Sequence, residues 1–335
     1  MKHERPKISD VARIAGVSTA TVSRAISSPD RVSVETRAAV QAAIDSTGYR
    51  LNHAARNLRR RRTGGIVALV PNLANPFFSQ ILSGIASVLG PAGYNLLVAD
   101  TETAGADSLL DYAEPSRADG LIVLDGRLSA DALRGRVPLV EACEWVPGLA
   151  APRIRIDNLA AAELAIGHLH DLGHRRIGHV TGPRGNVLTE SRLTGTRAAL
   201  AARHLVLTDD AIYSGDFSIE SGQAVADTWL GQPATSRPTA LFFASDAMAC
   251  GFIGEVQHRG LSVPRDVSVV GFDDIELVAH ISPPLTTIRQ PRTDIGRRAA
   301  ERLLAKIVGD PVDEDTILPV ELVVRASTCR VGRTG

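Results

Sequence analysis

The outer face of the stretch VSTATVSRAI, residues 17–26, has the chemistry needed to read the edges of DNA bases. Small side chains let a helix approach the bases closely, a Thr methyl group can touch the methyl group of thymine, and an arginine can pair with guanine. A buried helix would carry larger apolar groups, and an ordinary solvated helix would carry more Glu and Lys. At helical spacing the outward-facing residues are Thr19, Ala20, Ser23 and Arg24.

Short helices around this stretch are predicted to position that face. Ser9 is the expected N-cap of a first helix, and Gly16 permits a tight turn after it. Ser18 is expected to cap the second helix by accepting a hydrogen bond from the amide of Thr21. A helix, a glycine-containing turn and a second helix form the helix-turn-helix arrangement, whose second helix enters the major groove of DNA.

The other face of the second helix is predicted to pack inward. Val22 and Ile26 stand one helical turn apart on that face. A third helix is expected from about Ser33 to Gly48, where glycine suits a left-handed C-cap. The alternative is a three-helix module that binds another protein, because the turn signature is not unique to DNA-binding domains.

The charge of the chain is divided unevenly. The formal net charge of the 335 residues is zero, yet residues 1–62 contain 13 Lys and Arg against 5 Asp and Glu. A small basic module of this kind is typical of phosphate binding. We find neither a signal peptide nor a run of about 20 apolar residues. We therefore expect a cytoplasmic, nucleoid-associated protein without membrane contact.

The basic segment NHAARNLRRRRTGG, residues 52–65, contains one large apolar residue, Leu58, among arginines. Ala54, Ala55 and Leu58 would share one face of a helix. Such a short helix is marginal alone. Beside a second copy on DNA, two leucines could wedge into a minor-groove step and kink it. The alternative is a solvated basic linker.

Residues 8–59, ISDVARIAGVSTATVSRAISSPDRVSVETRAAVQAAIDSTGYRLNHAARNLR, resemble the DNA-binding headpiece and hinge of the LacI/GalR repressor family. The resemblance implies a homodimer that reads a pseudo-palindromic double-stranded operator. It places the recognition positions on Thr19, Ala20 and Arg24 and the minor-groove leucine on Leu58. The DNA-binding residues that it implies are Ser18, Thr19, Ala20, Thr21, Arg24, Tyr49, Asn52, Ala55 and Leu58.

The remainder of the chain alternates short apolar runs with helical patterns. The runs include IVALV (66–70), ALFFA (240–244) and VSVVGF (267–272), and segments such as 190–204 have the length and periodicity of helices. This alternation predicts parallel sheets with helices on both faces, arranged in two α/β lobes. Ligands of such sheets bind beyond the carboxyl ends of the strands, so the pocket is expected between the lobes.

Residues that could support catalysis or bind a metal do not form a recognisable motif. We find no G-x-S-x-G, no P-loop and no H-E-x-x-H, so no enzyme activity and no cofactor are expected. The segment TGPRGN (181–186) is better interpreted as a turn after a strand than as a phosphate cradle. Helix-end and surface positions account better than a metal site for four histidines, His168, His170, His174 and His179. Cys143, Cys250 and Cys329 lack metal-type spacing, and no disulfide framework is expected.

Segments such as PNLANPFFSQIL, TGPRGNVLTESRLTG and VPRDVSVVGFDDIE are similar to the periplasmic-binding-protein-like effector domain of the same family. The resemblance implies an all-α helix-turn-helix headpiece (1–50), a hinge helix and linker (51–62), and an effector-binding and dimerisation domain (63–335) with two Rossmann-like parallel-sheet lobes. The first lobe is expected at about 63–157 and 289–317. The second is expected at about 158–288 and 318–332.

The resemblance also implies which residues bind the effector. Arg192 would donate a fork of charge-assisted hydrogen bonds, Asp273 would accept from hydroxyl groups, and Phe217 would stack on the ligand. The full set is Phe77, Phe78, Asp125, Glu144, Trp145, Asn186, Arg192, Phe217, Ser245 and Asp273.

Each of these residues also has a structural interpretation. Phe77 and Phe78 could be core residues, and Arg192 could only balance Glu190 on its helix. One residue of the pair Asp273 and Asp274 is expected to cap a loop or a helix.

The effector is expected to be a nucleoside or a sugar. Segments such as GFDDIELVAHISPPLTTIRQPRTDIGRRA are similar to the nucleoside-responsive branch of the family, typified by the cytidine repressor. A nucleoside offers a flat base on which Phe217 or Trp145 can stack, ribose hydroxyls, and a base edge for the Asn186 amide. A free sugar uses the same hydroxyl chemistry. An activator built from the same parts remains an alternative, as does a sugar-binding transport protein of another class.

Two features depart from the family's pattern. The dipeptide Gly90–Pro91 stands where the first helix of the effector domain usually continues, so that helix is expected to stop early. Pro115 falls in what should be a helix. Both departures lie in the first lobe, near the surface expected to form the dimer.

Overall fold

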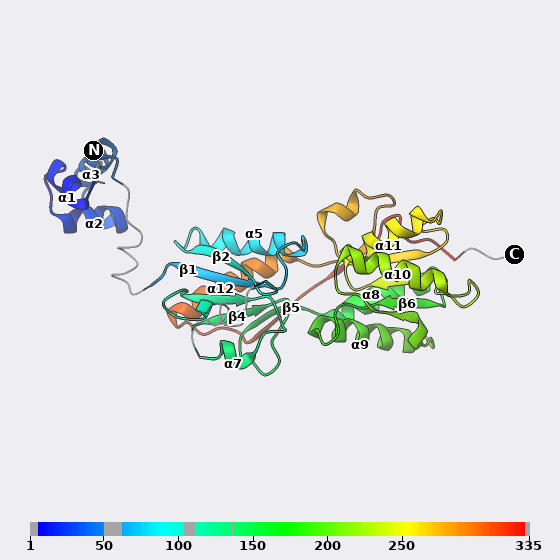
Figure 1. Cartoon of the computed structure of the whole chain (residues 1–335). Coiled ribbons are helices and arrows are strands. Elements are labelled where there is room, and N and C mark those ends of the chain that lie inside the picture. Colours follow the sequence, from blue (N-terminus) through cyan, green and yellow to red (C-terminus); the bar gives the residue numbers. More distant parts are fainter. Residues whose placement is uncertain (1–5, 50–61, 104–110, 136, 332–335) are drawn as a thin grey trace. The chain divides into compact units, whose positions relative to one another are not determined.

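The computed structural model describes residues 6–49, 62–103, 111–135 and 137–331 (Figure 1). The chain forms two compact units, Met1–Arg61 and Arg62–Gly335. The hinge helix expected at 51–62 lies outside the described residues, except for Arg62. The fold is therefore described one unit at a time.

The first unit is a small bundle of helices. It consists of α1 (Ile8–Ile14), α2 (Thr19–Ser27), the 3-10 turn η1 (Pro29–Arg31) and α3 (Val34–Thr47). Its buried core takes at least one residue from each α-helix, and Ile26 and Ile44 pack against it at the edge. The predicted inward face of α2 is confirmed, because Val22 is fully buried. The core residues are Val11, Ala12, Val22, Ala25, Val40 and Ala43.

The helix ends follow local signals, with one correction. Ser18 Oγ accepts from the Thr21 amide at 3.0 Å, and Gly48 ends α3 with φ 65°, both as predicted. The prediction of Ser9 as an N-cap is wrong, since α1 already begins at Ile8. The Asp10 carboxylate accepts from the Lys7 amide at 2.9 Å, and this bond makes Lys7 the N-cap of the helix.

The second unit contains two six-stranded sheets, one in each lobe. The first has the order β11-β5-β4-β3-β1-β2 and the second β12-β10-β9-β8-β6-β7. All pairings are parallel except that of β12 with β10, so the two-lobed α/β architecture is confirmed with one antiparallel edge. The first sheet comprises β1 (Gly65–Val70), β2 (Asn95–Asp100), β3 (Gly120–Val123), β4 (Leu139–Ala142), β5 (Arg153–Ile156) and β11 (Asp315–Leu318). The second comprises β6 (Ile177–Val180), β7 (Ile212–Tyr213), β8 (Ala240–Phe243), β9 (Ser268–Asp273), β10 (Thr286–Arg289) and β12 (Glu321–Val323).

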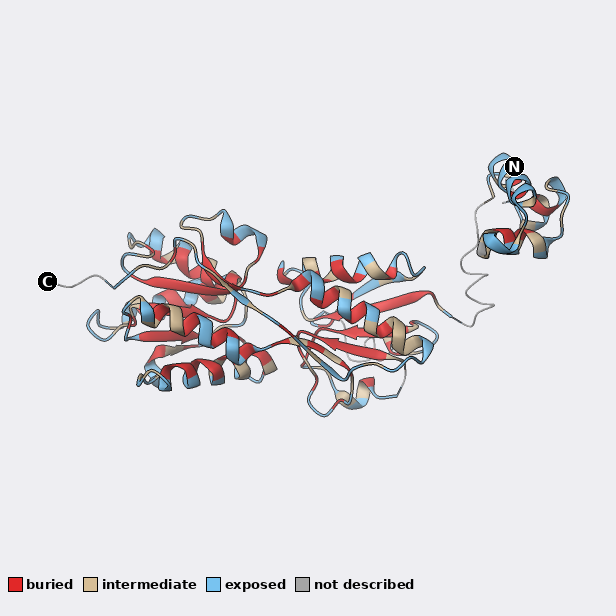
Figure 2. Cartoon of the chain, turned by 180° about the vertical axis from the view of Figure 1, so that it is seen from behind, coloured by how far each residue is buried: buried red, intermediate tan, exposed pale blue. Residues whose placement is uncertain are grey.

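Helices cover the sheets in packed pairs, and the central strands are buried (Figure 2). In the first lobe α5 (Phe77–Leu89) packs on α12 (Arg292–Val308), while the short α7 (Ala130–Leu133) contributes to the core on the opposite side. In the second lobe α8 (Asn158–Asp171) packs on α9 (Val187–Ala201), and α10 (Ile219–Gly231) packs on α11 (Asp246–His258). The unit also contains two 3-10 turns, η2 (Asp209–Ala211) and η3 (Glu276–Ala279).

The chain passes between the lobes three times: after β5, between β10 and α12, and between β11 and β12. The lobe boundaries expected at 289 and 318 need a small correction. Arg289 pairs with Asp273 in the second sheet, and Leu318 pairs with Ile156 in the first. Each strand therefore ends one residue beyond its expected lobe boundary, because backbone pairing continues to the last residue of the ladder.

Two details of the first lobe bear on its use. The early end of α5 is confirmed, since the helix stops at Leu89 before Gly90, and Pro115 lies in a turn. The Asp119 carboxylate accepts from the amides of Thr63 and Gly64, both at 2.8 Å, and so fixes the chain where it enters the first sheet. Within the described ranges, no helix is long and apolar enough to cross a membrane.

Candidate DNA-binding face and effector site

The exposed face of α2 is formed by the residues that the sequence predicts. Thr19, Ala20 and Arg24 are exposed, whereas Val22 and Ala25 on the opposite side are buried in the bundle. A short helix held by a buried face and capped at its N-terminus presents its first turn in a defined orientation. This is the geometry that a recognition helix needs in the major groove.

The hydroxyl groups at the start of α2 are partly engaged within the protein. The hydroxyls of Ser18 and Thr21 lie 2.9 Å apart, and Thr21 is half-buried. Tyr49 is also half-buried and packs against the core of the bundle. Three other predicted DNA-binding residues, Asn52, Ala55 and Leu58, lie outside the described residues.

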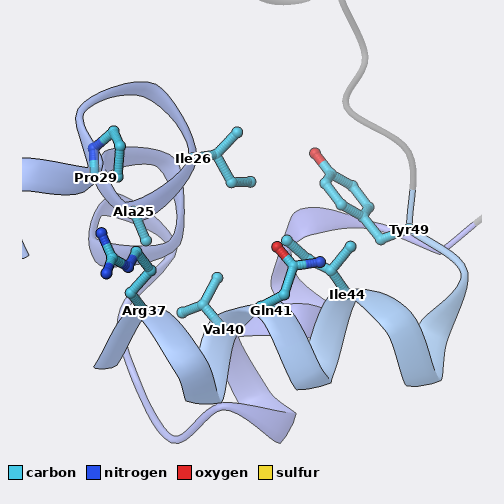
Figure 3. A pocket seen from close by; sticks show the side chains of 8 residues that line it. All are labelled: Ala25, Ile26, Pro29, Arg37, Val40, Gln41, Ile44 and Tyr49. Carbon is cyan, nitrogen blue, oxygen red and sulfur yellow. The ribbon is translucent and has the colours of Figure 1, made fainter. Parts of the chain in front are cut away.

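A groove in the same unit was not anticipated from the sequence. It has a volume of about 350 Å³ and lies between the end of α2, η1 and α3, with the Tyr49 ring at one side (Figure 3). None of Thr19, Ala20 and Arg24 lines it. The side chains come from three elements, so only the tertiary structure brings them together. They are Ala25, Ile26, Pro29, Arg37, Val40, Gln41, Ile44 and Tyr49.

In the second unit, polar residues gather at the carboxyl ends of the parallel strands. Asp125 follows β3, Glu144 follows β4, Ser245 follows β8, and Asp273 ends β9. Arg192 lies within electrostatic range of both Glu144 and Asp273, although these carboxylates belong to different lobes. We call the site formed by Asp125, Glu144, Arg192, Ser245 and Asp273, together with the residues that contact them, the inter-lobe site. Parallel α/β sheets place their ligands at this edge.

Arg192 is the central cation of the inter-lobe site. Its side chain is 2 % exposed, and its guanidinium carbon lies 3.6 Å from the centroid of the Phe272 ring. Nε donates to Asn158 Oδ1 at 3.0 Å and Nη1 to the Ala244 carbonyl at 2.6 Å. Burial lowers the pKa of Arg192, and the nearby carboxylates of Asp273 and Glu144 oppose that shift. The interpretation that Arg192 only balances Glu190 is wrong, because Glu190 is exposed and Arg192 faces inward.

Asp273 and Asp274 are adjacent in the sequence but contact different groups in the structure. Asp273 is 6 % exposed and accepts from Gln290 Nε2 at 2.7 Å. Burial raises the pKa of Asp273 to about 6, against the opposing influence of nearby arginines. Asp274 instead forms ion pairs with Arg289 and Arg325. Asp273 is therefore the member of the pair that belongs to the inter-lobe site.

Asp246 is a further buried carboxylate of this site, and the sequence analysis did not identify it. Its oxygens accept from Thr287 Oγ1 at 2.6 Å and from the Ile275 amide at 2.9 Å. Burial and the neighbouring charge of Asp273 raise the pKa of Asp246 well above its ordinary value. Its position at the start of α11, three residues after the end of β8, was the available signal.

The remaining polar residues predicted to bind the effector also hold the site together. Asp125 accepts from Thr101 Oγ1 and pairs with Arg127, with Nε and Oδ1 3.1 Å apart. Glu144 accepts from the Gly126 amide at 2.8 Å, and the Asn186 side chain of the other lobe acts to lower the pKa of Glu144. Burial raises the pKa of Glu144.

Two of these polar residues cap helices. Asn186 Oδ1 accepts from the amides of Leu188 and Thr189 at the start of α9. Ser245 Oγ accepts from the Met248 amide at 3.3 Å and caps α11.

The aromatic residues predicted to bind the effector differ in their packing. Phe77 and Phe78 are each 6 % exposed, contact one another edge to face and belong to the core. Trp145 is half-buried. Phe217 has a φ of 71°, and its ring lies directly against Gly182. A Cβ atom added at Gly182 would lie only 2.2 Å from that ring. Gly182 is thus required for the position of the Phe217 ring.

Direct contacts join the two lobes beside this site. Arg292, at the start of α12, donates from Nη2 to the Asp274 carbonyl at 2.8 Å. Its Nη1 lies 3.5 Å from the Phe77 carbonyl. Glu276 accepts from Gln80 of α5. These bonds connect the helices of the first lobe to the loop that follows β9.

The four histidines have separate surroundings, and the prediction of helix-end and surface positions is wrong for His179, which is fully buried in β6. His168 contacts Thr328, His174 contacts Thr239 and Ser268, and His179 contacts the Phe242 carbonyl. His170 lies at the end of α8 next to Asp171. In the part of the chain that is described, no group of three or more His, Cys, Asp or Glu residues is placed to hold a metal ion.

Comparison with protein families gives two matches. The model for bacterial regulatory proteins of the lacI family matches residues 7–52. The model for a periplasmic binding protein-like domain matches residues 166–328. The first match covers the bundle with the exposed α2 face, and the second covers most of the second lobe.

Comparison with individual proteins extends the likeness over nearly the whole chain. The chain is 39 % identical to the HTH-type transcriptional repressor CytR of Escherichia coli K12, over 95 % of each chain. It is 37 % identical to the ribose operon repressor of Haemophilus influenzae, over 89 % of this chain and 91 % of that one. The crystal structure of the lac repressor dimer bound to operator and the anti-inducer ONPF matches with a TM-score of 0.85. That match has 31 % identity and covers 97 % of this chain and all of the other.

Proposed function

The chain belongs to the lacI family of bacterial regulatory proteins, and we propose that it is a transcriptional repressor that binds a pseudo-palindromic operator as a homodimer. It is a regulator and not an enzyme. A small effector, a nucleoside or a sugar, binds in the inter-lobe site and changes the affinity for DNA. To act as a switch, the effector must bind the DNA-competent and DNA-incompetent states unequally.

One observation carries the DNA-binding half of this proposal: the capped helix α2 exposes Thr19, Ala20 and Arg24 while its other face is buried. The CytR relative, 39 % identical, is itself a transcriptional repressor, and the lac repressor relative is described as a dimer on its operator. The transport-protein alternative lacks a use for the lacI-type domain at residues 7–52. We propose that the protein acts in the cytoplasm, on the bacterial DNA.

Replacing Arg24 with alanine tests whether Arg24 of α2 recognises a guanine of the operator. A bidentate arginine–guanine contact discriminates by about 1–3 kcal/mol, so we expect specific operator affinity to fall about 5- to 150-fold. Non-specific affinity should fall far less. The measurement is fluorescence anisotropy on an operator selected from random DNA with the native protein, and on a scrambled duplex.

Arg13→Ala is the matched control for Arg24→Ala, because it removes the same charge from the exposed surface of α1. We expect Arg13→Ala to preserve the ratio of specific to non-specific affinity. If Arg24→Ala preserved that ratio as well, Arg24 would contribute only charge and would not read a base.

Replacing Leu58 with alanine tests the predicted minor-groove wedge. Leu58 lies outside the described residues, so this prediction rests on the sequence alone. Loss of the apolar wedge should weaken operator binding and reduce the DNA bend, with effector affinity unchanged. Leu58→Met keeps an apolar side chain of similar size and should bind nearly as the native protein does. Bending can be followed by energy transfer between dyes at the duplex ends, and unchanged operator affinity for Leu58→Ala would contradict the wedge.

The effector half of the proposal rests on Arg192 and Asp273, opposite charges that face the same buried site. Each affects the pKa of the other, yet these two described residues are not joined by an ion pair within 4.0 Å. A donor and an acceptor held apart in this way suit the hydroxyl groups of a ligand, each of which donates and accepts. We propose that Phe217 stacks on the ligand from its seat over Gly182.

Thermal unfolding against nucleosides, nucleobases, pentoses and hexoses tests the class of effector. A ligand that binds only the folded state stabilises it by RT ln(1 + [L]/Kd), and so raises the midpoint. A shift with cytidine or adenosine but not with ribose would support a base in the site. A shift with a free sugar alone would remove the proposed stacking role of Phe217 and Trp145. It would also bring the chain closer to its ribose-operon relative.

Repression and activation use the same parts, and the position of the operator relative to the promoter separates them. Transcription from a reporter that carries the selected operator, with and without the chain, distinguishes the two. A fall in transcription supports the repressor, and a rise supports the activator.

A further inference from the structure

The arginines of the inter-lobe site are already committed to other groups. Arg192 donates to Asn158 and to the Ala244 carbonyl, and its planar face lies against the Phe272 ring. Arg292 donates to the Asp274 carbonyl and lies 3.4 Å from Glu276. Arg127 pairs with Asp125. Each of the three already donates to groups of the protein, and the buried Nε of Arg292 is a donor that lacks a hydrogen-bond partner among the described residues.

Buried carboxyl groups outnumber the cations at this edge of the sheets. Asp125, Glu144, Asp246 and Asp273 are exposed by 2 %, 6 %, 0 % and 6 %. Once Arg127 has neutralised Asp125, three carboxyl groups face two arginines. Burial raises the pKa of each of these three groups, which means that negative charge is already unfavourable here.

The N-termini of α9 and α11 are partly occupied by side chains of the protein. Anion sites commonly use the free amides of a first helical turn. At α9 the amides of Leu188 and Thr189 already bond to Asn186. At α11 the Met248 amide bonds to Ser245. These three amides are therefore not available to a phosphate.

We propose that the effector is an uncharged, hydroxyl-bearing molecule and that the inter-lobe site rejects its phosphorylated forms. This inference rests on the proposed function and refines it. A phosphate monoester carries about −1.5 to −2 charges at pH 7. In a buried site its repulsion from Glu144, Asp246 and Asp273 is only weakly screened. The hydroxyl groups of a neutral ligand can instead donate to the carboxyl groups of Glu144 and Asp273. The chain would thus respond to a nucleoside or free sugar, and not to the corresponding monophosphate.

The experiment compares neutral ligands with their phosphorylated partners on the full chain. Calorimetric titrations use adenosine, cytidine and uridine with their 5′-monophosphates, ribose with ribose 5-phosphate, and glucose with glucose 6-phosphate. Ionic strength is held constant by added NaCl. For each pair in which the neutral member binds, we expect the phosphorylated member to bind at least about 100-fold more weakly. This ratio corresponds to a binding free-energy difference of about 2.8 kcal/mol, because each tenfold change in Kd is about 1.4 kcal/mol.

Two other outcomes overturn the inference in distinguishable ways. A monophosphate or sugar phosphate that binds as tightly as its neutral partner, or more tightly, would overturn it while the effector-regulated repressor stands. If no member of any pair binds, the proposed effector class is wrong, and the inference is overturned with it.

A charge-neutralising variant tests the cause of the discrimination. Glu144→Gln removes a carboxylate but keeps an oxygen that can accept from the Gly126 amide. We therefore expect the ratio of the dissociation constants of the phosphorylated and neutral ligands to fall severalfold. Glu190→Gln removes an exposed charge from α9 and should leave the ratio unchanged. An unchanged ratio in a folded Glu144→Gln variant would overturn the electrostatic cause. If that variant does not fold, the titrations of the native chain still decide the inference.

Discussion

Replacing Arg192 with alanine is expected to abolish the effector response at ligand concentrations that saturate the native protein. A hydrogen bond to a charged group contributes about 1.5–3 kcal/mol, so losing the hydrogen bond from Arg192 to the effector should lower effector affinity about 10- to 150-fold. Arg192 is 2 % exposed and is the central cation among Glu144, Asp246 and Asp273. Its removal leaves these buried carboxyl groups without their main counter-charge.

The measurement is operator binding as a function of effector, with thermal unfolding as a check of folding. Arg197→Ala, which removes an exposed arginine from the same helix, should respond as the native protein does. Operator affinity without effector should be retained in both variants. An Arg192→Ala protein that still responds at native ligand concentrations would exclude Arg192 from the effector site.

Replacing Gly251 with alanine is expected to destabilise the second lobe strongly. A Cβ atom at this position of α11 would lie 2.0 Å from the Ile219 carbonyl oxygen of α10, and one at Gly222 would lie 2.0 Å from the Met248 carbonyl oxygen. The two helices therefore pack backbone against backbone, and neither contact can be relieved by rotating a side chain. Overpacking in a core costs about 1–3 kcal/mol or more, which exceeds the gain of about 1 kcal/mol from helix propensity.

Gly254→Ala is the matched control on the same helix. Gly254 is exposed, and nothing lies within 4 Å of an added Cβ atom. Only the propensity gain remains there, so this variant should be about 0.5–1 kcal/mol more stable than the native protein. Thermal or denaturant unfolding should show opposite shifts for the two variants. Equal shifts would mean that α10 and α11 separate freely, contrary to the close packing seen here.

The sequence alone predicts features that depend on neighbours a few residues apart. The Ser18 cap on Thr21, the left-handed Gly48 and the early end of α5 at Leu89 all follow such short-range rules. Buried strands such as β1 and β8 are recognisable as apolar runs because both faces of a parallel sheet are covered. Ser9 shows the limit of these rules. Ser9 and Asp10 are adjacent polar residues near the start of the same helix. The hydrogen bond that Asp10 accepts from the Lys7 amide makes Lys7, and not Ser9, the N-cap.

Beyond the residues that the family resemblance implied, only the tertiary structure decided which polar residues join the inter-lobe site and how they are connected. Asn158, Arg192 and the Ala244 carbonyl come from three elements far apart in the chain, yet hydrogen bonds join them. Asp246 and Gln290 carry no motif and become part of the site through their contacts with Thr287 and Asp273.

The division follows from the range of the forces involved. Caps, turns and apolar periodicity act within a few residues, so the sequence by itself determined the helix-turn-helix bundle and the two-lobed class of fold. Sheet register and helix packing bring together residues more than a hundred positions apart. They assigned Asp273 to the inter-lobe site and its neighbour Asp274 to ion pairs with Arg289 and Arg325. Local rules treat these two adjacent aspartates alike, and only the packed surroundings of each make them different.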